Sequence, residues 1–210
     1  MAVITISRQL GSGAEQIAKT LCQTLGYAYF DANLMRSVIA ESGLPLAEPI
    51  DFAEHDYRVM NILEKLLPMR RLVGHALVRW PSGKSELREF YERESVELVR
   101  FLVRTAARRG NVVIVGRGGQ AILRDQADAL HVRIVAPLKE RIRRTQHTLG
   151  VTHAEASRLI NERDRAAAEY LLRFHGIAWD DPLLYHLVIN TGRWSTGRAA
   201  QLIVDALRRL

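Results

Sequence analysis

Short apolar runs alternate along the chain with longer stretches in which apolar residues recur at helical spacing. The short runs predict five β-strands, at residues 2–7, 27–31, 111–116, 129–135 and 185–191. In the first helical stretch, Ile17, Leu21 and Leu25 share one face, and Gly26 is placed to end the helix. Strands separated by helices predict an α/β fold with a parallel sheet flanked by helices on both faces.

The spacing of these elements predicts one domain over residues 1–210. A long and mostly helical stretch separates the second predicted strand from the third, and we interpret residues 45–105 as a helical insert. Two further helices, at 138–150 and 153–174, are joined by a glycine-containing turn and could close over a ligand. We call residues 138–170 the lid region. In parallel sheets, ligands bind beyond the carboxyl ends of the strands, so site residues are expected there.

A glycine-rich loop, "SRQLGSG" (7–13), follows the first predicted strand and precedes a helix. Loops in that context bind phosphate in proteins with the motif G-x-x-x-x-G-K-[ST]. If Gly13 is the second glycine of the motif, the lysine position holds Ala14 and the hydroxyl position holds Glu15. A literal "GKS" occurs at 83–85, but no strand precedes it, so we do not assign it to phosphate.

The loop retains features that bind anions without a lysine. Gly11 and Gly13 allow a tight turn around Ser12, and the backbone N–H groups at the start of the helix can point at a phosphate. Arg8 is the candidate for the missing cation. A plain strand-to-helix turn is the alternative that the sequence leaves open.

Arginine supplies nearly all of the positive charge of this chain, which carries a formal net charge of +7. The planar guanidinium is suited to paired contacts with phosphate oxygens. Arg117 lies in "GRGG" (116–119), after the third predicted strand, where an arginine is expected to meet an anion. Arg141 and Arg144 share a face of the first lid helix. Exposed arginines on solvated helix faces are the alternative interpretation.

Several classes of protein are not favoured by the sequence. No run approaches the roughly 18 apolar residues of a membrane-spanning helix, and residues 1–20 are too polar for a signal peptide. Cys22 is the single cysteine, and we expect a soluble cytoplasmic protein. The histidines are scattered without the spacing of a metal site. Positive charge alone favours nucleic acid, but no binding motif accompanies it, so that partner is not expected. The sequence does not indicate an oligomeric state.

As an ordered set, six stretches resemble the cytidylate kinase-like family, a branch of the P-loop nucleoside monophosphate kinases. They are "ITISRQLGSGAEQIAKTL", "YFDANLM", "VVIVGRGG", "HVRIVAPLKERIRR", "INERDRAA" and "WDDPLLYHLVINT". The resemblance implies a P-loop kinase-type sheet of five parallel strands, a helical insert that binds a monophosphate, and a small basic lid. It also implies transfer of the ATP γ-phosphate to a nucleoside monophosphate with Mg²⁺, a reaction that depends mainly on positioning and charge neutralisation.

The resemblance also implies which residues bind the donor nucleotide. Gly11, Ser12 and Gly13 would cradle the phosphates of ATP. The turn after the last predicted strand would border the adenine, with Thr191 and Arg193 as the nucleotide-binding residues.

A second group of residues would serve the acceptor and the transferred phosphoryl group. Arg117, together with Arg36 after the second predicted strand, would bind the acceptor monophosphate. Arg141, Arg144 and Arg163 would act from the lid as catalytic residues.

The chain departs from the family at positions that matter for chemistry. Ala14 replaces the lysine of cytidylate kinases, and Glu15 stands where the wider family typically has an arginine. Gly118 and Ala167 replace aspartates that recognise cytosine and ribose, which leaves the acceptor base open. A catalytically weak or inactive nucleotide sensor on the same fold is therefore an alternative, although the retained lid arginines oppose it.

Overall fold

The structure is a computed structural model that describes residues 2–30 and 84–210, with side chains from Val96 onward in the second range. The chain divides into two compact units, residues 1–30 with 107–210 and residues 31–106. Most of the predicted insert, residues 45–105, lies outside the described residues, as does Arg36.

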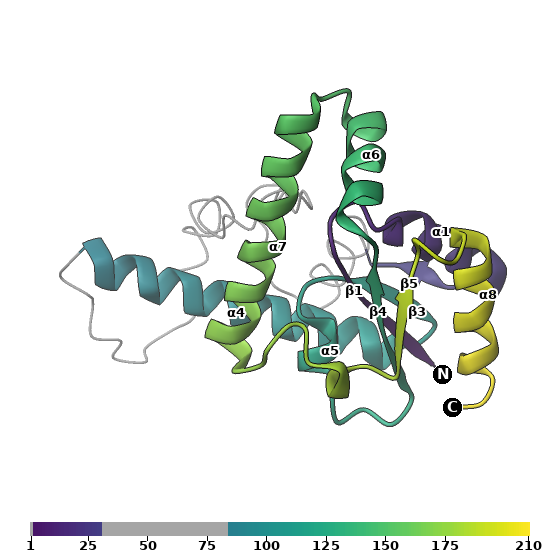
Figure 1. The fold of residues 1–210 in the computed structure, drawn as a ribbon. Helices are drawn as coiled ribbons and strands as arrows, with labels where there is room; N and C mark the ends of the chain where they lie inside the picture. The colour runs from purple at the N-terminus through teal and green to yellow at the C-terminus, as the bar shows by residue number, and fades with distance from the viewer. Residues whose placement is uncertain (1, 31–83) are drawn as a thin grey trace. The chain divides into compact units, whose positions relative to one another are not determined.

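Five parallel strands form one sheet, as predicted, and their order in it is β2-β3-β1-β4-β5 (Figure 1). The strands are β1 (Val3–Arg8), β2 (Ala28–Tyr29), β3 (Val112–Val115), β4 (Ala129–Val135) and β5 (Leu187–Asn190). β1 lies between β3 and β4, so the glycine-rich loop leaves the sheet at the centre of its carboxyl edge.

The helices of the first unit follow the predicted pattern with one addition. They are α1 (Ala14–Leu25), the end of α4 (Lys84–Arg109), α5 (Gly119–Ile122), α6 (Leu138–Leu149), α7 (His153–His175) and α8 (Thr196–Leu207). The four-residue α5 was not predicted, because it is too short to show a helical period. A 3-10 turn, Pro182–Leu184, precedes β5.

The predicted lid forms a hairpin of α6 and α7 (Figure 1). Gly150 ends α6 in the left-handed conformation, with φ of 67°. Thr152 then caps α7 by accepting the N–H of Glu155, whose carboxylate accepts the N–H of Thr152 in return. These two caps satisfy helix-end groups that have no partner within a helix, and they fix the turn between the two helices. No helix in the described ranges is both long and apolar enough to cross a membrane.

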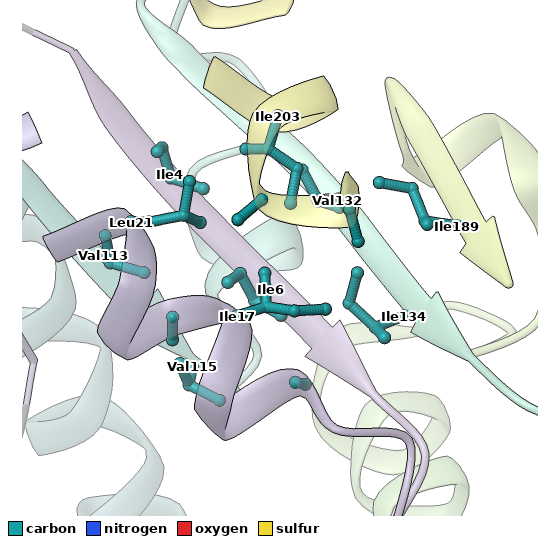
Figure 2. Packing of buried hydrophobic residues seen from close by; sticks show 14 of the residues in the cluster. Ile4, Ile6, Ile17, Leu21, Val113, Val115, Val132, Ile134, Ile189 and Ile203 are labelled. Carbon is teal, nitrogen blue, oxygen red and sulfur yellow. The ribbon is translucent and has the colours of Figure 1, made fainter. Parts of the chain in front are cut away.

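One face of the sheet carries the main hydrophobic core against α1 and α8. Figure 2 shows side chains of β1, β3, β4 and β5 meeting those of the two helices, among them Ile4, Ile6, Val132, Ile134, Ile17, Leu21 and Ile203. Cys22 packs at the margin of this core, and burial raises the pKa of its thiol, which agrees with a packing role. The core anchors both ends of the glycine-rich loop, β1 and α1, to one rigid body.

The opposite face of the sheet is polar near its centre, because alternate residues of a strand point to opposite faces. Thr5 Oγ1 lies 2.7 Å from Nδ1 of His131, which is 5% exposed. The backbone N–H of His131 donates to Nδ1 of His186, and the two rings stack with centroids 5.2 Å apart. Burial, assisted by the neighbouring His186, lowers the pKa of His131 to about 4.

Acid is therefore expected to lower the free energy of unfolding at pH values where His131 of the folded protein is still neutral. The unfolded chain binds a proton at His131 near pH 6.5, whereas the folded chain resists protonation until about pH 4, so stability is lost as the pH falls through this window. Allowing for solvent screening, we expect a loss of about 2 kcal/mol. Urea unfolding at pH 7.5 and 4.5 measures it. His131→Asn should remove most of the loss, and the exposed His153→Asn should not; equal losses in all three proteins would contradict the prediction.

Candidate phosphate site

The loop between β1 and α1 can only be built with glycine at two positions. Gly11 and Gly13 have φ of 75° and 83°, in the left-handed region that side chains disfavour. A Cβ on Gly11 would lie 2.6 Å from the carbonyl oxygen of Arg141 and 2.7 Å from Oγ1 of Thr145. The loop therefore packs directly against the backbone of α6, which is the first helix of the lid region.

The tip of the loop has backbone N–H groups that donate to no acceptor among the described residues. Leu10 and Ser12 use their N–H groups, which donate to Asp164 and to the carbonyl of Gln9. The N–H groups of Gly11, Gly13 and Ala14 have no acceptor in the part of the chain that is described. Gly13 is also the N-cap of α1, so the positive end of the helix dipole reinforces these donors. In other proteins, donors arranged in this way at a helix N-terminus bind phosphate groups.

Arg8, the predicted substitute for the missing lysine, forms an ion pair with Glu15 in the first turn of α1. Its Nε donates to Oε1 of Glu15 at 2.6 Å, and the two side chains are 14% and 39% exposed. Arg8 also lies beside the turn after β3, since a Cβ on Gly116 would be 2.9 Å from its terminal nitrogen. The cation is thus at the site, but Glu15 offsets its charge.

Arg144 reaches the loop from α6 and contacts backbone carbonyls. Its guanidinium donates to the carbonyl of Ser12 at 3.0 Å, to the hydroxyl of Thr191 at 2.9 Å and to the carbonyl of Thr191 at 2.8 Å. The Thr191 hydroxyl in turn donates to the carbonyl of Ser12 at 2.6 Å. Arg144 and Thr191, both predicted as site residues, therefore meet at the loop and tie it to the turn after β5.

Arg141 holds the other side of the loop through an ion pair with Asp164 of α7. The two groups are 2.5 Å apart, and the side chains are 9% and 19% exposed. The second carboxylate oxygen of Asp164 accepts the N–H of Leu10 at 3.0 Å, so both lid helices clamp the loop. Asp164 was not predicted as a site residue, although the alternation of acidic and basic residues in "NERDRAA" was an available signal.

The remaining predicted residues that the structure describes are Arg117, Arg163 and Arg193. Arg117 follows β3 with an unusual φ of 57°. Arg163 is half-buried on α7 beside Asp164, and within the described residues its guanidinium makes no hydrogen bond or ion pair. Arg193 is exposed in the turn after Thr191.

Hydrogen bonding around the loop is incomplete. Ser12 Oγ, Thr145 Oγ1 and Arg141 Nε are buried and have no partner within the described chain. Each such group costs about 1–3 kcal/mol, so natural structures keep few of them, and those that persist call for an explanation such as a functional role. One of the three belongs to the loop and the other two lie on α6, against which the loop packs, and this singles out this part of the molecule.

Structural neighbours show the fold class. The solved structure of an uncharacterized protein from Eubacterium ventriosum aligns over 99% of both chains with a TM-score of 0.66 and 17% identity. Shikimate kinase from Bacteroides thetaiotaomicron aligns over 99% of this chain and 98% of its own, with a TM-score of 0.51 and 15% identity. The fold is thus that of the P-loop kinases, including the parallel five-stranded sheet flanked by helices.

Sequence comparison places the chain more narrowly. Cytidylate kinase of Aeropyrum pernix is 29% identical over 97% of this chain and 98% of its own length, and that of Pyrococcus horikoshii is 28% identical over 99% and 89%. Residues 3–193 match the Cytidylate kinase-like family. Family and fold together support a nucleotide kinase, for which nucleotides are the substrates and ATP the expected donor. The chain therefore belongs to the cytidylate kinase-like family.

Proposed function

We propose that this protein transfers the γ-phosphate of ATP to a nucleoside monophosphate, with a cytidylate-like acceptor. The observation that carries the proposal is the set of unspent N–H groups of Gly11, Gly13 and Ala14, at the N-terminus of α1 and at the carboxyl end of the central strand. The acceptor is proposed because relatives that span nearly the whole chain are named cytidylate kinase.

The roles proposed for the lid arginines differ with their contacts. Arg141 and Arg144 contact the loop backbone, so their first role is to hold its donors in place. Arg163 has no polar partner among the described residues, which leaves its charge available for the transferring phosphoryl group. A fixed cation at that point stabilises charge that develops in the transition state.

Arg117, and Arg36 outside the described residues, remain proposals for the acceptor phosphate. Thr191 and Arg193 remain proposals for the nucleotide.

Magnesium fits the oxygen donors near the loop. The described residues contain no cluster of three histidine, cysteine or acidic side chains that would hold a metal by themselves. Mg²⁺ instead commonly binds through one or two carboxylates together with substrate phosphates and water. Glu15 is a partly exposed carboxylate in the first turn of α1 and is the residue that we propose for this contact. Bound there, the ion would neutralise phosphate charge.

A nucleotide sensor without transfer activity is the second candidate, and the Arg8–Glu15 pair favours it. A carboxylate that offsets the loop's cation weakens the attraction for a transferring phosphate. This candidate predicts that ATP binds and stabilises the protein while no acceptor is phosphorylated.

Calorimetric titration with ATP, with and without Mg²⁺, followed by turnover assays on nucleoside monophosphates, tests the proposal. We expect micromolar binding and turnover with CMP or a related acceptor. Arg163→Ala should lower kcat more than ATP affinity, whereas Arg165→Ala should change neither, since Arg165 is exposed and paired with Glu169. Binding without turnover of any acceptor would favour the sensor, and absence of binding at millimolar ATP would refute both.

Glu15→Gln is expected to raise the affinity for metal-free ATP by about tenfold, because it removes a like charge near the phosphates and releases Arg8 from its ion pair. With Mg²⁺ present the gain should shrink, since the metal loses its carboxylate. Calorimetry in EDTA and in excess Mg²⁺ measures both. Glu140→Gln makes the same change in net charge at the Arg143 ion pair and should leave both affinities unaltered. Equal effects of the two variants would show that overall charge, and not the loop, is responsible.

A further inference from the structure

Arg133 of β4 is a deeply buried cation that the phosphate site does not use. The residue is 6% exposed, as deep as many side chains of the hydrophobic core. Among the described residues it makes one hydrogen bond, from a terminal nitrogen to the hydroxyl of Tyr185 at 3.3 Å. No carboxylate among the described residues forms an ion pair with it. Buried arginines are almost always paired with an anion, because removing a charge from water is costly.

Two aromatic rings cover the guanidinium of Arg133. Its central carbon lies 4.6 Å from the ring centroid of Trp179 and 5.5 Å from that of Tyr185. Contacts of this kind stabilise a cation through the face of an aromatic ring. They do not consume the N–H donors, which lie in the plane of the guanidinium. Of its five donors, one is engaged with Tyr185, and the others have no acceptor among the described residues.

The aromatic cage is itself fixed by hydrogen bonds. The indole N–H of Trp179 donates to Oγ of Ser7 at 2.8 Å, and the hydroxyl of Tyr185 donates to the carbonyl of Trp179 at 2.8 Å. Trp179 also packs with Ala167 and Leu171 of α7. The guanidinium is therefore held in one orientation, so little conformational entropy is lost when it binds a ligand.

Arg133 lies at the edge of the sheet where ligands are expected. It is paired in register with Ser7, the residue before Arg8, and β4 ends two residues later at Val135. Ser7 and Arg133 are on the polar face, opposite the core of α1 and α8. The carboxyl edge of a parallel sheet is the usual location of its binding site.

We propose that the in-plane donors of Arg133 bind an oxyanion of the acceptor substrate, either a phosphate monoester or a carboxylate. A guanidinium recognises both groups through paired hydrogen bonds. The assignment of this anion to the acceptor substrate rests on the proposed phosphotransfer. The binding of an oxyanion by Arg133 does not depend on that function.

Kinetics with matched variants test the role in acceptor binding. Arg133→Met, which removes the charge and keeps much of the volume, should raise the KM for the acceptor at least tenfold while ATP binding stays unchanged. Arg165→Met removes an exposed arginine outside the site and should leave KM unaltered. A structural role alone would instead lower the melting temperature and weaken ATP binding and acceptor binding together, and that outcome would overturn the proposal.

Nuclear magnetic resonance of the native protein provides a readout that does not depend on activity. In protein with ¹⁵N-labelled arginine, the Nε–H signal of Arg133 is identified by its loss in Arg133→Lys, or in Arg133→Met. It should shift on titration with CMP and with inorganic phosphate, and the same titration with acetate tests a carboxylate source. A signal that moves with none of the three would overturn the inference. A signal that moves in a protein that phosphorylates no acceptor would support anion binding while the proposed function fails.

Discussion

Asp164→Ala is expected to lower the free energy of unfolding by about 3 kcal/mol, because it leaves the buried Arg141 guanidinium without its counter-ion. The substitution also removes the acceptor of the Leu10 N–H, which ties the loop to α7. We therefore expect weaker ATP binding in addition to lower stability. Urea unfolding and calorimetric titration measure the two effects.

The same helix supplies a matched control. Glu169 forms an exposed ion pair with Arg165, in which the side chains are 64% and 81% exposed, and Glu169→Ala should cost no more than about 0.5 kcal/mol. Asp164→Asn, which keeps an acceptor for Leu10 but loses the charge, should fall between the two. If Asp164→Ala and Glu169→Ala destabilise the protein equally, the clamp on the loop does not exist as described.

Gly11→Ala is expected to abolish most ATP binding, with affinity falling more than tenfold. The alanine Cβ would lie 2.6 Å from the carbonyl oxygen of Arg141, so either the loop or α6 must move. The left-handed conformation adds strain of about 1–2 kcal/mol for any residue with a side chain. Displacement of the loop redirects its donors, which is why binding should suffer more than stability alone accounts for.

Gly150→Ala separates these two contributions. Gly150 has a similar φ of 67°, but a Cβ there would meet no atom within 4 Å. The Gly150→Ala variant should lose about 1 kcal/mol of its free energy of unfolding from conformational strain and should bind ATP like the parent protein. ATP affinity of Gly11→Ala close to that of Gly150→Ala would falsify the close packing of the loop against α6.

Local patterns were sufficient for most of the fold. The apolar run at 129–135 coincides with β4, and the helical period at 138–150 and 153–174 agrees with α6 and α7 to within a residue or two. These elements depend on neighbours in sequence, so their signals are visible in short windows. The last strand was predicted from residue 185 but begins at Leu187, because Tyr185 still belongs to the end of the 3-10 turn, where its N–H donates to the carbonyl of Pro182.

The position of the phosphate loop was also visible, since its glycines and its place between a strand and a helix are local features. The orientation of the charges around it was not. Arg8 was predicted to serve the phosphates, and the structure brings it to the loop but pairs it with Glu15. Arg144 was predicted to act on a phosphoryl group and is found on the carbonyl of Ser12. Their proposed roles toward nucleotide remain predictions.

By itself, the sequence determined the order of strands and helices along the chain and the glycine-rich turn between the first strand and the first helix. It also carried the resemblance that placed the chain in its family. The tertiary structure alone decided which charge meets which partner. Asp164 contacts Leu10 across 154 positions of sequence, and Trp179 reaches Ser7 across 172. Such contacts depend on how the packed layers bring distant segments together, and no periodicity within one segment encodes them.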